Sequence, residues 1–371
     1  MALNCGIVGL TNVGKTTLFN CVSKTKAEVS HFAFSVTKSN FGMADVPDMR
    51  LFEISKLIQP VKTVPATVNL VDLPGLAKGA SHGEGVGNIF LTDVQKTNAL
   101  IHVIRCFDDP LLPHVEGSVD PVRDKELIDL ELQVRDLDLI ERKIIRYEKL
   151  LKTGEKDAKS AISFLNHIKD RLENFSNVRD MEITENEEEL YLQDLFLLTM
   201  KPVIYVCNVD DASAFSGNSY SEKLSEAVKN EKTEVIVVAG KLESEIAELA
   251  NEDDRQLFLN DAGLKEPGVN RLIRSAYRLL NLKSFFTAGP KEVRAWTIKH
   301  GMTAQQAAGV IHSDLERGFI RAEVMTYNDL LQHKTEQAVK EAGKFRLEGK
   351  KYIVQDGDIM HIRFNVSEKK Q

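Results

Sequence analysis

The spacing of hydrophobic positions differs between three parts of the chain, and each spacing predicts a different kind of structure. Short apolar runs rich in β-branched residues alternate with amphipathic stretches in the first part and again after residue 200. Such runs are typical of buried strands. The runs are Leu3–Val8, Thr67–Val71, Leu100–Arg105, Pro202–Cys207 and Val235–Val238. Strands that alternate with helices predict an α/β fold with a mostly parallel sheet covered on both faces.

A second pattern occupies residues 124–199, a segment rich in charged residues. Its apolar side chains recur at steps of three and four in two stripes that Gly154 separates. Two amphipathic helices with a short break between them predict an antiparallel coiled-coil hairpin that is inserted into the first domain and projects from it. Two helices packed flat on the sheet are the alternative. The stripes are Leu130, Val134, Leu137, Ile140, Ile144, Tyr147 and Leu151, then Ala161, Leu165, Ile168, Leu172 and Phe175.

The third pattern begins near Ser284 and predicts a small α+β domain. We expect strands at Ser284–Ala288, Glu292–Ile298 and Ile320–Thr326, a helix at Ala304–Glu316, and within Tyr352–Phe364 two strands around a turn at Asp356–Gly357. The predicted organisation is therefore a first domain of residues 1–123 and 200–283, a helical insertion of residues 124–199, and a C-terminal domain of residues 284–367.

Length and composition agree with a soluble protein of several domains. The chain has 371 residues, of which 43% are hydrophobic and 28% charged, and this length suggests two or three domains. Apolar runs all fall short of the roughly 18 residues that a membrane helix needs, and the apolar start is interpreted as a strand and not a signal peptide. The four cysteines form no Cys-x-x-Cys pair, which favours reduced thiols in a cytoplasmic protein.

The charge is unevenly distributed. The whole chain carries −7, whereas residues 283–371 hold fifteen Lys/Arg and eleven Asp/Glu and so carry +4. The first 282 residues therefore carry −11. The net charge of −7 argues against a general nucleic-acid coat, and DNA is not expected as a partner. A mildly basic end on an acidic body is a weak indication of contact with RNA or a ribosome, and an ordinary solvated surface is the alternative.

The most specific motif is Gly-Leu-Thr-Asn-Val-Gly-Lys-Thr at Gly9–Thr16, a complete phosphate-binding loop between a predicted strand and a predicted helix. Backbone N–H groups of the segment Asn12-Val13-Gly14-Lys15-Thr16-Thr17 can surround phosphates at the positive end of the helix. Lys15 is expected to reach the β- and γ-phosphates and to act in catalysis, and the Thr16 hydroxyl to bind Mg²⁺.

A second motif, Asp72-Leu73-Pro74-Gly75, follows a predicted strand. Asp72 is expected to hold Mg²⁺ through water, and the Gly75 N–H to sense the γ-phosphate. The segment from Gly79 to Gly87 holds four further glycines among nine residues. A loop of this kind loses much entropy on ordering, which suits a switch that orders around a γ-phosphate.

Two residues of this region bear on the rate of hydrolysis. Leu76 stands where Ras-like GTPases carry the glutamine that orients the attacking water. Intrinsic hydrolysis is therefore expected to be slow or to use another group. His82 is the nearest candidate for polarising water, with an ordinary solvated loop histidine as the alternative.

The base-reading segment is Asn208-Val209-Asp210-Asp211, after the strand that ends at Cys207. GTPases usually show Asn-Lys-x-Asp, in which the aspartate accepts hydrogen bonds from guanine and the lysine stem packs on the base. Asp211 is present, but Val209 replaces the lysine. These residues leave the base open, with a slight preference for guanine.

Taken together, the motifs make the chain resemble the YchF / Obg-like ATPase family, a branch of the Obg-related translation-factor GTPases. The resemblance spans nearly the whole chain. Early matching segments are Cys5-Gly6-Ile7-Val8-Gly9-Leu10, Asn12-Val13-Gly14-Lys15-Thr16-Thr17, Gly83-Glu84-Gly85 with Gly87-Asn88, and His102-Val103 with Arg105-Cys106-Phe107. Late ones are Phe286-Thr287-Ala288-Gly289, Lys291-Glu292-Val293-Arg294-Ala295-Trp296, Arg346-Leu347-Glu348-Gly349-Lys350 and Tyr352-Ile353-Val354-Gln355-Asp356-Gly357-Asp358.

The resemblance implies a P-loop nucleotide-binding domain, an inserted helical coiled coil and a C-terminal TGS domain of the β-grasp type. It also implies a preference for ATP, association with the ribosome, stress-linked regulation and hydrolysis stimulated by K⁺, with Asn12 as the K⁺ ligand. Asn208 and the backbone at Val209 are carried over as contacts to the base.

Two departures from the family pattern matter. The first switch of the family usually reads Pro-Phe-x-Thr-Ile-Glu-Pro-Asn, and its threonine completes the Mg²⁺ shell, whereas residues 33–40 read Ala-Phe-Ser-Val-Thr-Lys-Ser-Asn. Val36 takes the threonine position without a side-chain oxygen, so weaker Mg²⁺ binding or an altered switch is expected. Asp211 replaces the usual glutamate and leaves room for GTP.

We therefore expect a cytoplasmic, monomeric ATPase that needs Mg²⁺, is stimulated by K⁺ and acts as a slow switch on the ribosome or its RNA. A GTPase or dual ATP/GTP-binding protein with little hydrolysis is the alternative, and an RNA-binding scaffold with a vestigial site is a third interpretation.

Overall fold

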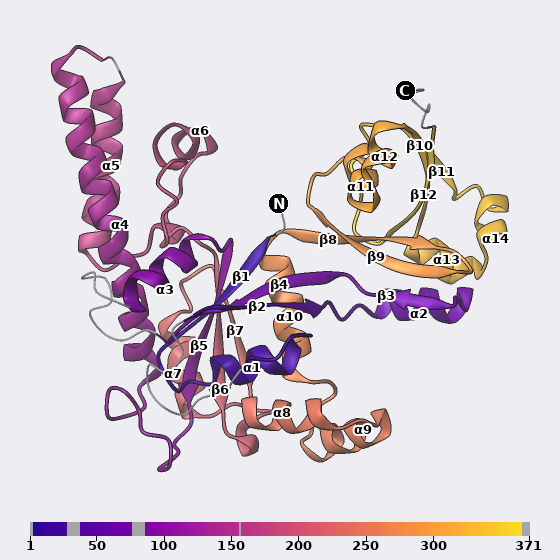
Figure 1. The fold of residues 1–371 in the computed structure, drawn as a ribbon, viewed down its shortest axis with the longest axis horizontal. Coiled ribbons are helices and arrows are strands. Elements are labelled where there is room, and N and C mark those ends of the chain that lie inside the picture. Colours follow the sequence, from indigo (N-terminus) through magenta and orange to yellow (C-terminus); the bar gives the residue numbers. More distant parts are fainter. Residues whose placement is uncertain (1–2, 28–37, 76–85, 156, 366–371) are drawn as a thin grey trace. The chain divides into compact units, whose positions relative to one another are not determined.

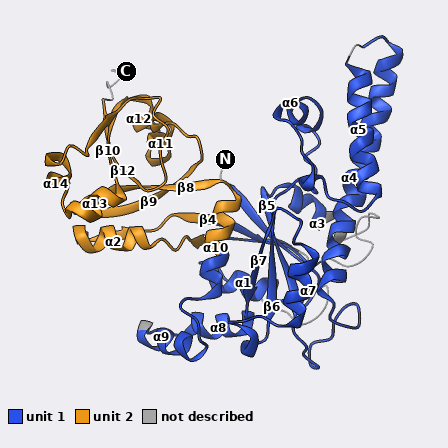
Figure 2. Cartoon of the chain, turned by 180° about the vertical axis from the view of Figure 1, so that it is seen from behind, with its two compact units in different colours: residues 1–43, 69–272 blue, residues 44–68, 273–371 orange. Residues whose placement is uncertain are grey.

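The computed structural model describes residues 3–27, 38–75, 86–155 and 157–365. They form two compact units, coloured separately in Figure 2: unit 1 comprises residues 1–43 and 69–272, and unit 2 comprises residues 44–68 and 273–371. Residues 44–68 therefore group with the C-terminal part of the chain, which differs from the predicted first domain. The reason is that β3 (Lys62–Val64) pairs with β9 (Glu292–Lys299) in the sheet of unit 2.

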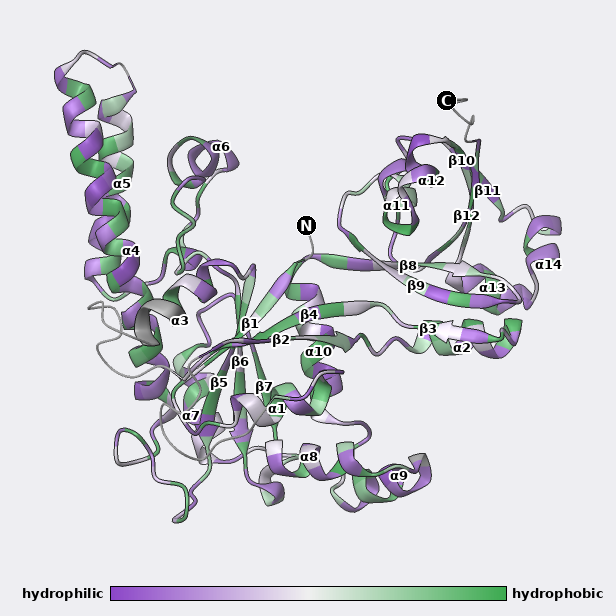
Figure 3. Cartoon of the chain, in the orientation of Figure 1, coloured by the Kyte–Doolittle hydropathy of each residue, from purple (hydrophilic) through white to green (hydrophobic). Residues whose placement is uncertain are grey.

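Unit 1 is built on a sheet with strand order β2-β4-β1-β5-β6-β7. Its strands are β1 (Asn4–Val8), β2 (Asn40–Asp45), β4 (Thr67–Asp72), β5 (Ala99–Cys106), β6 (Val203–Val209) and β7 (Glu234–Val238). The pairs β4–β1, β1–β5, β5–β6 and β6–β7 are all parallel. Every residue of β5 and β6 is buried, which explains their mostly apolar sequences (Figure 3). The predicted α/β class and parallel sheet are thus confirmed.

The longer helices of this part of the chain do not all cover the sheet (Figure 1). They are α1 (Lys15–Val22), α3 (Val86–Gln95), α4 (Pro121–Lys152), α5 (Ala158–Glu173), α7 (Ser219–Ala227), α8 (Gly240–Glu248), α9 (Glu252–Asp261) and α10 (Gly268–Leu279). Shorter turns are η2 (Val178–Asp180), α6 (Glu185–Glu187), the π-helical η3 (Glu188–Leu192) and η4 (Asp211–Ser213). Helix α1 packs against α8, and α4 packs against β5 and α7.

The helical segment forms the predicted hairpin of α4 and α5 (Figure 1). Its core joins Ile140 and Ile144 of α4 to Leu165, Ile168 and Leu172 of α5. The alternative of two flat helices holds only for the start of α4, which contacts the sheet. Helix α4 therefore packs against the sheet near its start and against α5 further along. Figure 3 shows hydrophobic and hydrophilic residues alternating along both helices.

A buried carboxylate ties α4 to the chain that returns from the hairpin. Asp136 is fully buried and accepts hydrogen bonds from the backbone N–H groups of Leu198 (2.9 Å) and Thr199 (2.7 Å) and from the Thr199 hydroxyl (2.6 Å). Next to it, the Lys201 ammonium donates to the backbone oxygens of Gln95 (3.2 Å) and Thr97, at the end of α3. Helices α3 and α4 are thus joined through residues 198–201.

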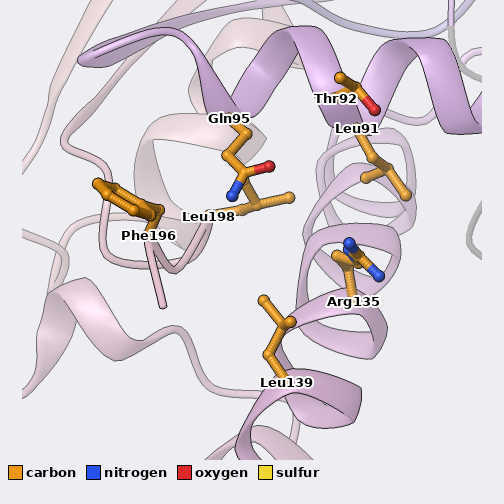
Figure 4. A pocket seen from close by; sticks show the side chains of 7 residues that line it. All are labelled: Leu91, Thr92, Gln95, Arg135, Leu139, Phe196 and Leu198. Atoms are coloured by element: carbon orange, nitrogen blue, oxygen red, sulfur yellow. The ribbon is translucent and has the colours of Figure 1, made fainter. Parts of the chain in front are cut away.

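Figure 4 shows the small cavity that lies at this junction. Its volume is about 30 Å³, too small for an organic ligand. The lining residues are Leu91, Thr92 and Gln95 of α3, Arg135 and Leu139 of α4, and Phe196 and Leu198. Phe196 has a positive φ of 49°, a conformation that bulky residues rarely adopt.

Unit 2 is a sheet with strand order β11-β10-β12-β8-β9-β3. Its remaining strands are β8 (Leu282–Ala288), β10 (Phe319–Thr326), β11 (Arg346–Glu348) and β12 (Asp358–Phe364). Its helices are α2 (Met49–Ile58), α11 (Ala304–Ile311), α12 (Ser313–Arg317), α13 (Tyr327–His333) and α14 (Glu336–Glu341). The alanines of α11 pack on Phe285, Ile298 and Phe319 to form the core, an arrangement that agrees with the expected β-grasp type.

Residues 44–68 are held in unit 2 by a charged contact as well as by strand pairing. Arg50 of α2 donates to both carboxylate oxygens of Asp356 (2.9 and 3.2 Å), and its guanidinium lies over the Phe286 ring at 5.4 Å. The Asp356 carboxylate also accepts from the Ser284 N–H at 3.0 Å. The predicted turn at Asp356–Gly357 is therefore an anchoring point for α2.

Two predictions in unit 2 are wrong. The helix expected over Ala304–Glu316 is interrupted at His312, whose extended backbone ends α11 and whose ring accepts from the Asp314 N–H (3.1 Å) to begin α12. The strand expected before the Asp356–Gly357 turn does not form, because that segment bonds to residues 302–304 instead. The bonds are Ala304 N–H to Tyr352 O (2.7 Å) and Val354 N–H to Met302 O (3.1 Å), and they leave an isolated bridge at Ile353.

All four cysteines are free thiols, as expected. Cys5, Cys106 and Cys207 are buried, and burial raises the pKa of Cys5 to about 12. Within the described residues, every helix is too short or too polar to cross a bilayer.

The buried Asp136 yields a stability prediction. Asp136→Ala should lower the free energy of unfolding of unit 1 by about 3 kcal/mol, because two buried N–H groups lose their acceptor. Urea unfolding followed by far-UV circular dichroism would measure the change. Asp138→Ala is the matched control, since Asp138 is partly exposed on the same helix and pairs with surface arginines, so its loss should cost at most about 0.5 kcal/mol. Equal effects of the two variants would contradict the anchoring role.

Candidate nucleotide-binding site

The phosphate-binding loop joins β1 to α1, and its glycines are required by close packing. Gly9 has φ 150°, and a Cβ there would lie 2.3 Å from the Val103 carbonyl oxygen. Gly14 has φ 95°, and a Cβ there would lie 2.3 Å from Asn208 Nδ2. Side chains are excluded at both positions. The motif is therefore packed closely against residues of β5 and β6.

Helix α1 begins at Lys15 with Gly14 as its N-cap, and no side chain caps it. The first N–H groups of a helix lack partners within the helix, so those of residues 14–17 are available to an anion at the positive end of α1. Asn12 adopts a positive φ of 62°, which asparagine tolerates, and Val13 is buried. The loop thus leaves N–H groups at the start of α1 without partners inside the helix, and their contact with phosphates stays a prediction.

Lys15 is a buried cation at the centre of the site. Its side chain is mostly buried, and Nζ donates to the Leu10 carbonyl oxygen at 2.6 Å. Burial lowers the pKa of Lys15 to about 8, against a smaller opposing effect of the Asp72 charge. A Cβ on Gly75 would lie 3.3 Å from Lys15 Nζ, so these two expected catalytic residues are neighbours.

Thr16 and Asp72 come together as expected for a metal site. The Thr16 hydroxyl donates to Asp72 Oδ2 at 2.9 Å, while Asp72 Oδ1 is buried and has no hydrogen-bond partner among the described residues. Burial raises the pKa of Asp72, and the Lys15 charge and the Thr16 hydrogen bond oppose this shift. A buried carboxylate oxygen without a partner is costly, and a hard cation such as Mg²⁺ would satisfy it.

The oxygen ligands offered by Thr16 and Asp72 suit Mg²⁺ better than a metal ion whose ligands all come from protein side chains. Among the described residues, there is no cluster of three His, Cys, Asp or Glu side chains that could hold a metal ion. Mg²⁺ usually binds through one or two protein oxygens together with phosphate oxygens and water. Thr16 and Asp72 would hold it in this structure.

Asn208 connects three loops at the base side of the site. Its Nδ2 donates to the Val13 carbonyl oxygen (2.8 Å), and its Oδ1 accepts from the Gly240 N–H (2.8 Å). Asn208 and Val209 are both buried. Asn208 therefore positions the phosphate loop, and its contact with a base stays a prediction.

The sequence did not point to the segment after β7. Lys241 lies there, 3.7 Å from the Asp211 carboxylate, and both side chains are exposed. The sequence could have indicated this segment, because the strand Val235–Val238 was expected to run parallel to its neighbours. Parallel strands end at one edge of a sheet, so the residues after this strand should lie beside the other loops of the site. Asn40 was also missed as a site residue, and its Nδ2 lies 3.4 Å from Asp72 Oδ2.

Three residues singled out in the sequence, Val36, Leu76 and His82, lie outside the described residues. Their expected roles stay predictions. Asn12 as a K⁺ ligand also stays a prediction, as does each nucleotide contact proposed for the loop.

The comparisons with known proteins agree with this site. A family model described as "50S ribosome-binding GTPase" matches residues 4–146, and the model YchF-GTPase_C, described as a protein of unknown function, matches residues 282–365. The "Ribosome-binding ATPase YchF" of Bacillus subtilis is 48% identical over 368 residues, which cover 99% of this chain and 100% of that protein. The protein of the same name from Pasteurella multocida is 47% identical over 366 residues, with 99% and 100% coverage.

A solved structure is similar along the same length. The Schizosaccharomyces pombe YchF GTPase superposes with a TM-score of 0.84 at 33% identity, and the match covers 97% of each chain. Full-length identity of this order, together with the complete phosphate-binding loop and the Thr16–Asp72 pair, shows that the chain belongs to the YchF family of P-loop nucleoside triphosphatases.

Proposed function

We propose that the chain binds ATP with Mg²⁺, hydrolyses it slowly, and acts as a regulatory switch on the ribosome. The observation that carries the proposal is the convergence of Lys15, Thr16 and Asp72, with Asp72 Oδ1 left for a cation. The names of the full-length relatives, which describe ribosome-binding ATPases, support both the nucleotide and the partner. A ribosomal role also implies a cytoplasmic location.

Different residues stabilise charge, sense the γ-phosphate and orient the attacking water during hydrolysis. Lys15 and the N–H groups at the start of α1 stabilise charge that develops on the β- and γ-phosphates. Thr16 and Asp72 would hold Mg²⁺, which would supply further positive charge for the phosphates. We expect the Gly75 N–H to sense a γ-phosphate, and His82 is the candidate for orienting water.

Slow hydrolysis follows from two side chains. Leu76 cannot orient water as a glutamine would, and Val36 offers the metal no side-chain oxygen. A K⁺ ion at Asn12 would add the positive charge that an arginine finger provides in other enzymes. Stimulation by K⁺ is accordingly part of the proposal.

The second candidate function is a GTP-binding or dual-specificity protein with little hydrolysis. The observation in its favour is Asp211, an aspartate at the position that reads guanine in GTPases. Its carboxylate is partly engaged by Lys241 at 3.7 Å, and an exposed pair of this kind is worth about 1 kcal/mol or less. Asp211 therefore stays accessible to a guanine base. Comparing the rates of hydrolysis of ATP and GTP distinguishes the two candidate functions.

Hydrolysis should depend on Lys15 and on K⁺. Single-turnover rates with ATP should be higher in K⁺ than in Na⁺ and higher than with GTP. Lys15→Ala should lower the ATP rate by about 100-fold, because charge on the transferred phosphoryl group loses a donor. Lys62→Ala, at an exposed lysine of β3, is the control. Rates that do not differ between wild type and Lys15→Ala would favour the non-hydrolysing alternative, and a clear preference for GTP would overturn the base assignment.

Binding should also weaken in alkaline solution. Lys15 has a pKa of about 8 in the free protein, whereas a bound triphosphate favours its charged form. Above pH 8, binding must therefore take up a proton, so affinity for ATP should fall about tenfold between pH 7 and pH 9.

Calorimetry in buffers of different ionisation enthalpy would report an uptake of about one proton per ATP at pH 9. Lys15→Arg keeps its charge throughout this range and should bind without the pH dependence. Wild-type affinity that is constant from pH 7 to 9, with no proton uptake, would contradict the assignment of Lys15 to the phosphates.

Ribosome association should respond to the nucleotide. The fraction of the protein that co-sediments with ribosomes should change between ATP, ADP and no nucleotide, and Lys15→Ala should remove the difference. Co-sedimentation that is the same in every nucleotide state would instead support the scaffold interpretation.

A further inference from the structure

The two oxygens of the Asp72 carboxylate are used unequally. Oδ2 accepts from the Thr16 hydroxyl at 2.9 Å and from the Asn40 amide at 3.4 Å. Oδ1 is buried without a hydrogen-bond partner among the described residues. A carboxylate held by two donors on one oxygen cannot rotate freely about its Cβ–Cγ bond without losing them. The donors therefore determine which oxygen is left for a cation.

Thr16 alone would restrain this carboxylate weakly, since its hydroxyl also has to offer a lone pair to the metal. Asn40 is different, because its Nδ2 group is a donor only and cannot be a metal ligand through that atom. It begins β2, the edge strand next to β4. The amide thus reaches Asp72 from the neighbouring strand, independently of the phosphate loop.

A second hydrogen bond holds the segment that carries Asn40. The Ser39 hydroxyl donates to Asp93 Oδ2 of α3 at 2.6 Å. The same carboxylate accepts from Lys96 at 2.8 Å through its other oxygen. These bonds lower the pKa of Asp93, against the opposing effect of burial, so Asp93 stays charged and is a strong acceptor for Ser39.

We propose that Asn40 is a positioning residue that turns Asp72 Oδ1 toward Mg²⁺ and so sets the affinity for the metal. Ser39 supports it by fixing the start of β2 to α3. This inference rests on the proposed function, because it concerns the same Mg²⁺–ATP site. It also identifies what assists Thr16 and Asp72 in a chain whose Val36 has no side-chain oxygen to offer.

The test is a Mg²⁺ titration of the full-length protein with a fluorescent ATP analogue. Asn40→Leu has a similar volume but no amide, and it should raise the half-saturating Mg²⁺ concentration about tenfold, as changes behind a metal ligand commonly do. Affinity for the analogue in EDTA and the thermal melting temperature should both stay at wild-type values. Ser39→Ala should act in the same direction by about threefold, since it loosens the support and leaves the amide.

Matched controls separate positioning from general damage. Asn69→Leu removes an asparagine of β4 whose amide donates to Asn4 at 3.2 Å, away from Asp72. Lys96→Ala removes the other partner of Asp93 and leaves Ser39 in place. Both controls should keep the wild-type Mg²⁺ dependence. If Asn40→Leu unfolds, Asn40→Ala tests the same amide without an added apolar side chain.

The outcomes distinguish failure of the role of Asn40 from failure of the proposed function. Unchanged Mg²⁺ dependence in a folded Asn40 variant would overturn the inference, and so would an equal loss of affinity with and without Mg²⁺. If the wild-type protein itself fails to bind the ATP analogue, or binds it with no response to Mg²⁺, the proposed function fails, and the inference that rests on it fails as a consequence.

Discussion

The parallel pairing of β4, β1, β5, β6 and β7 is the constraint on which the site depends. Parallel strands all end at the same edge of a sheet, so segments far apart in the chain become neighbours there. The phosphate loop follows β1, Asp72 ends β4, Asn208 lies near the end of β6 and Gly240 follows β7. Pairing of the buried backbone thus places these groups together before any ligand contributes.

Burial at that edge makes each polar group dependent on its neighbours. Lys15 and Asp72 are both removed from water, and removal of a charge from water is costly unless it is compensated. Their opposite charges compensate in part, and hydrogen bonds to Leu10 and Thr16 add to this. The remaining oxygen of Asp72 is uncompensated within the described residues, which is the physical reason that the edge suits a cation and a phosphate chain.

The same principle joins the helical hairpin to the rest of unit 1. Asp136 is buried where α4 leaves the sheet, and its three donors all belong to residues 198–199. Lys201 continues the connection to the end of α3, the helix that follows the glycine-rich segment expected to respond to nucleotide. The hairpin is therefore attached through hydrogen bonds to buried charged groups, which tolerate displacement less readily than apolar contacts do.

The sequence by itself determined the parallel strands of unit 1, the hairpin and the phosphate loop, because each depends on local spacing: continuous apolar runs, a three-and-four periodicity and the glycines around Lys15. It did not reveal that residues 44–68 pair with unit 2, that His312 interrupts a helix, or that the segment near Ile353 bonds to residues 302–304. Only the tertiary structure decided these points and the positions of Asn40 beside Asp72 and of Lys241 beside Asp211. The physical reason is that strand pairing and buried hydrogen bonds choose partners by position in space, which local periodicity does not record.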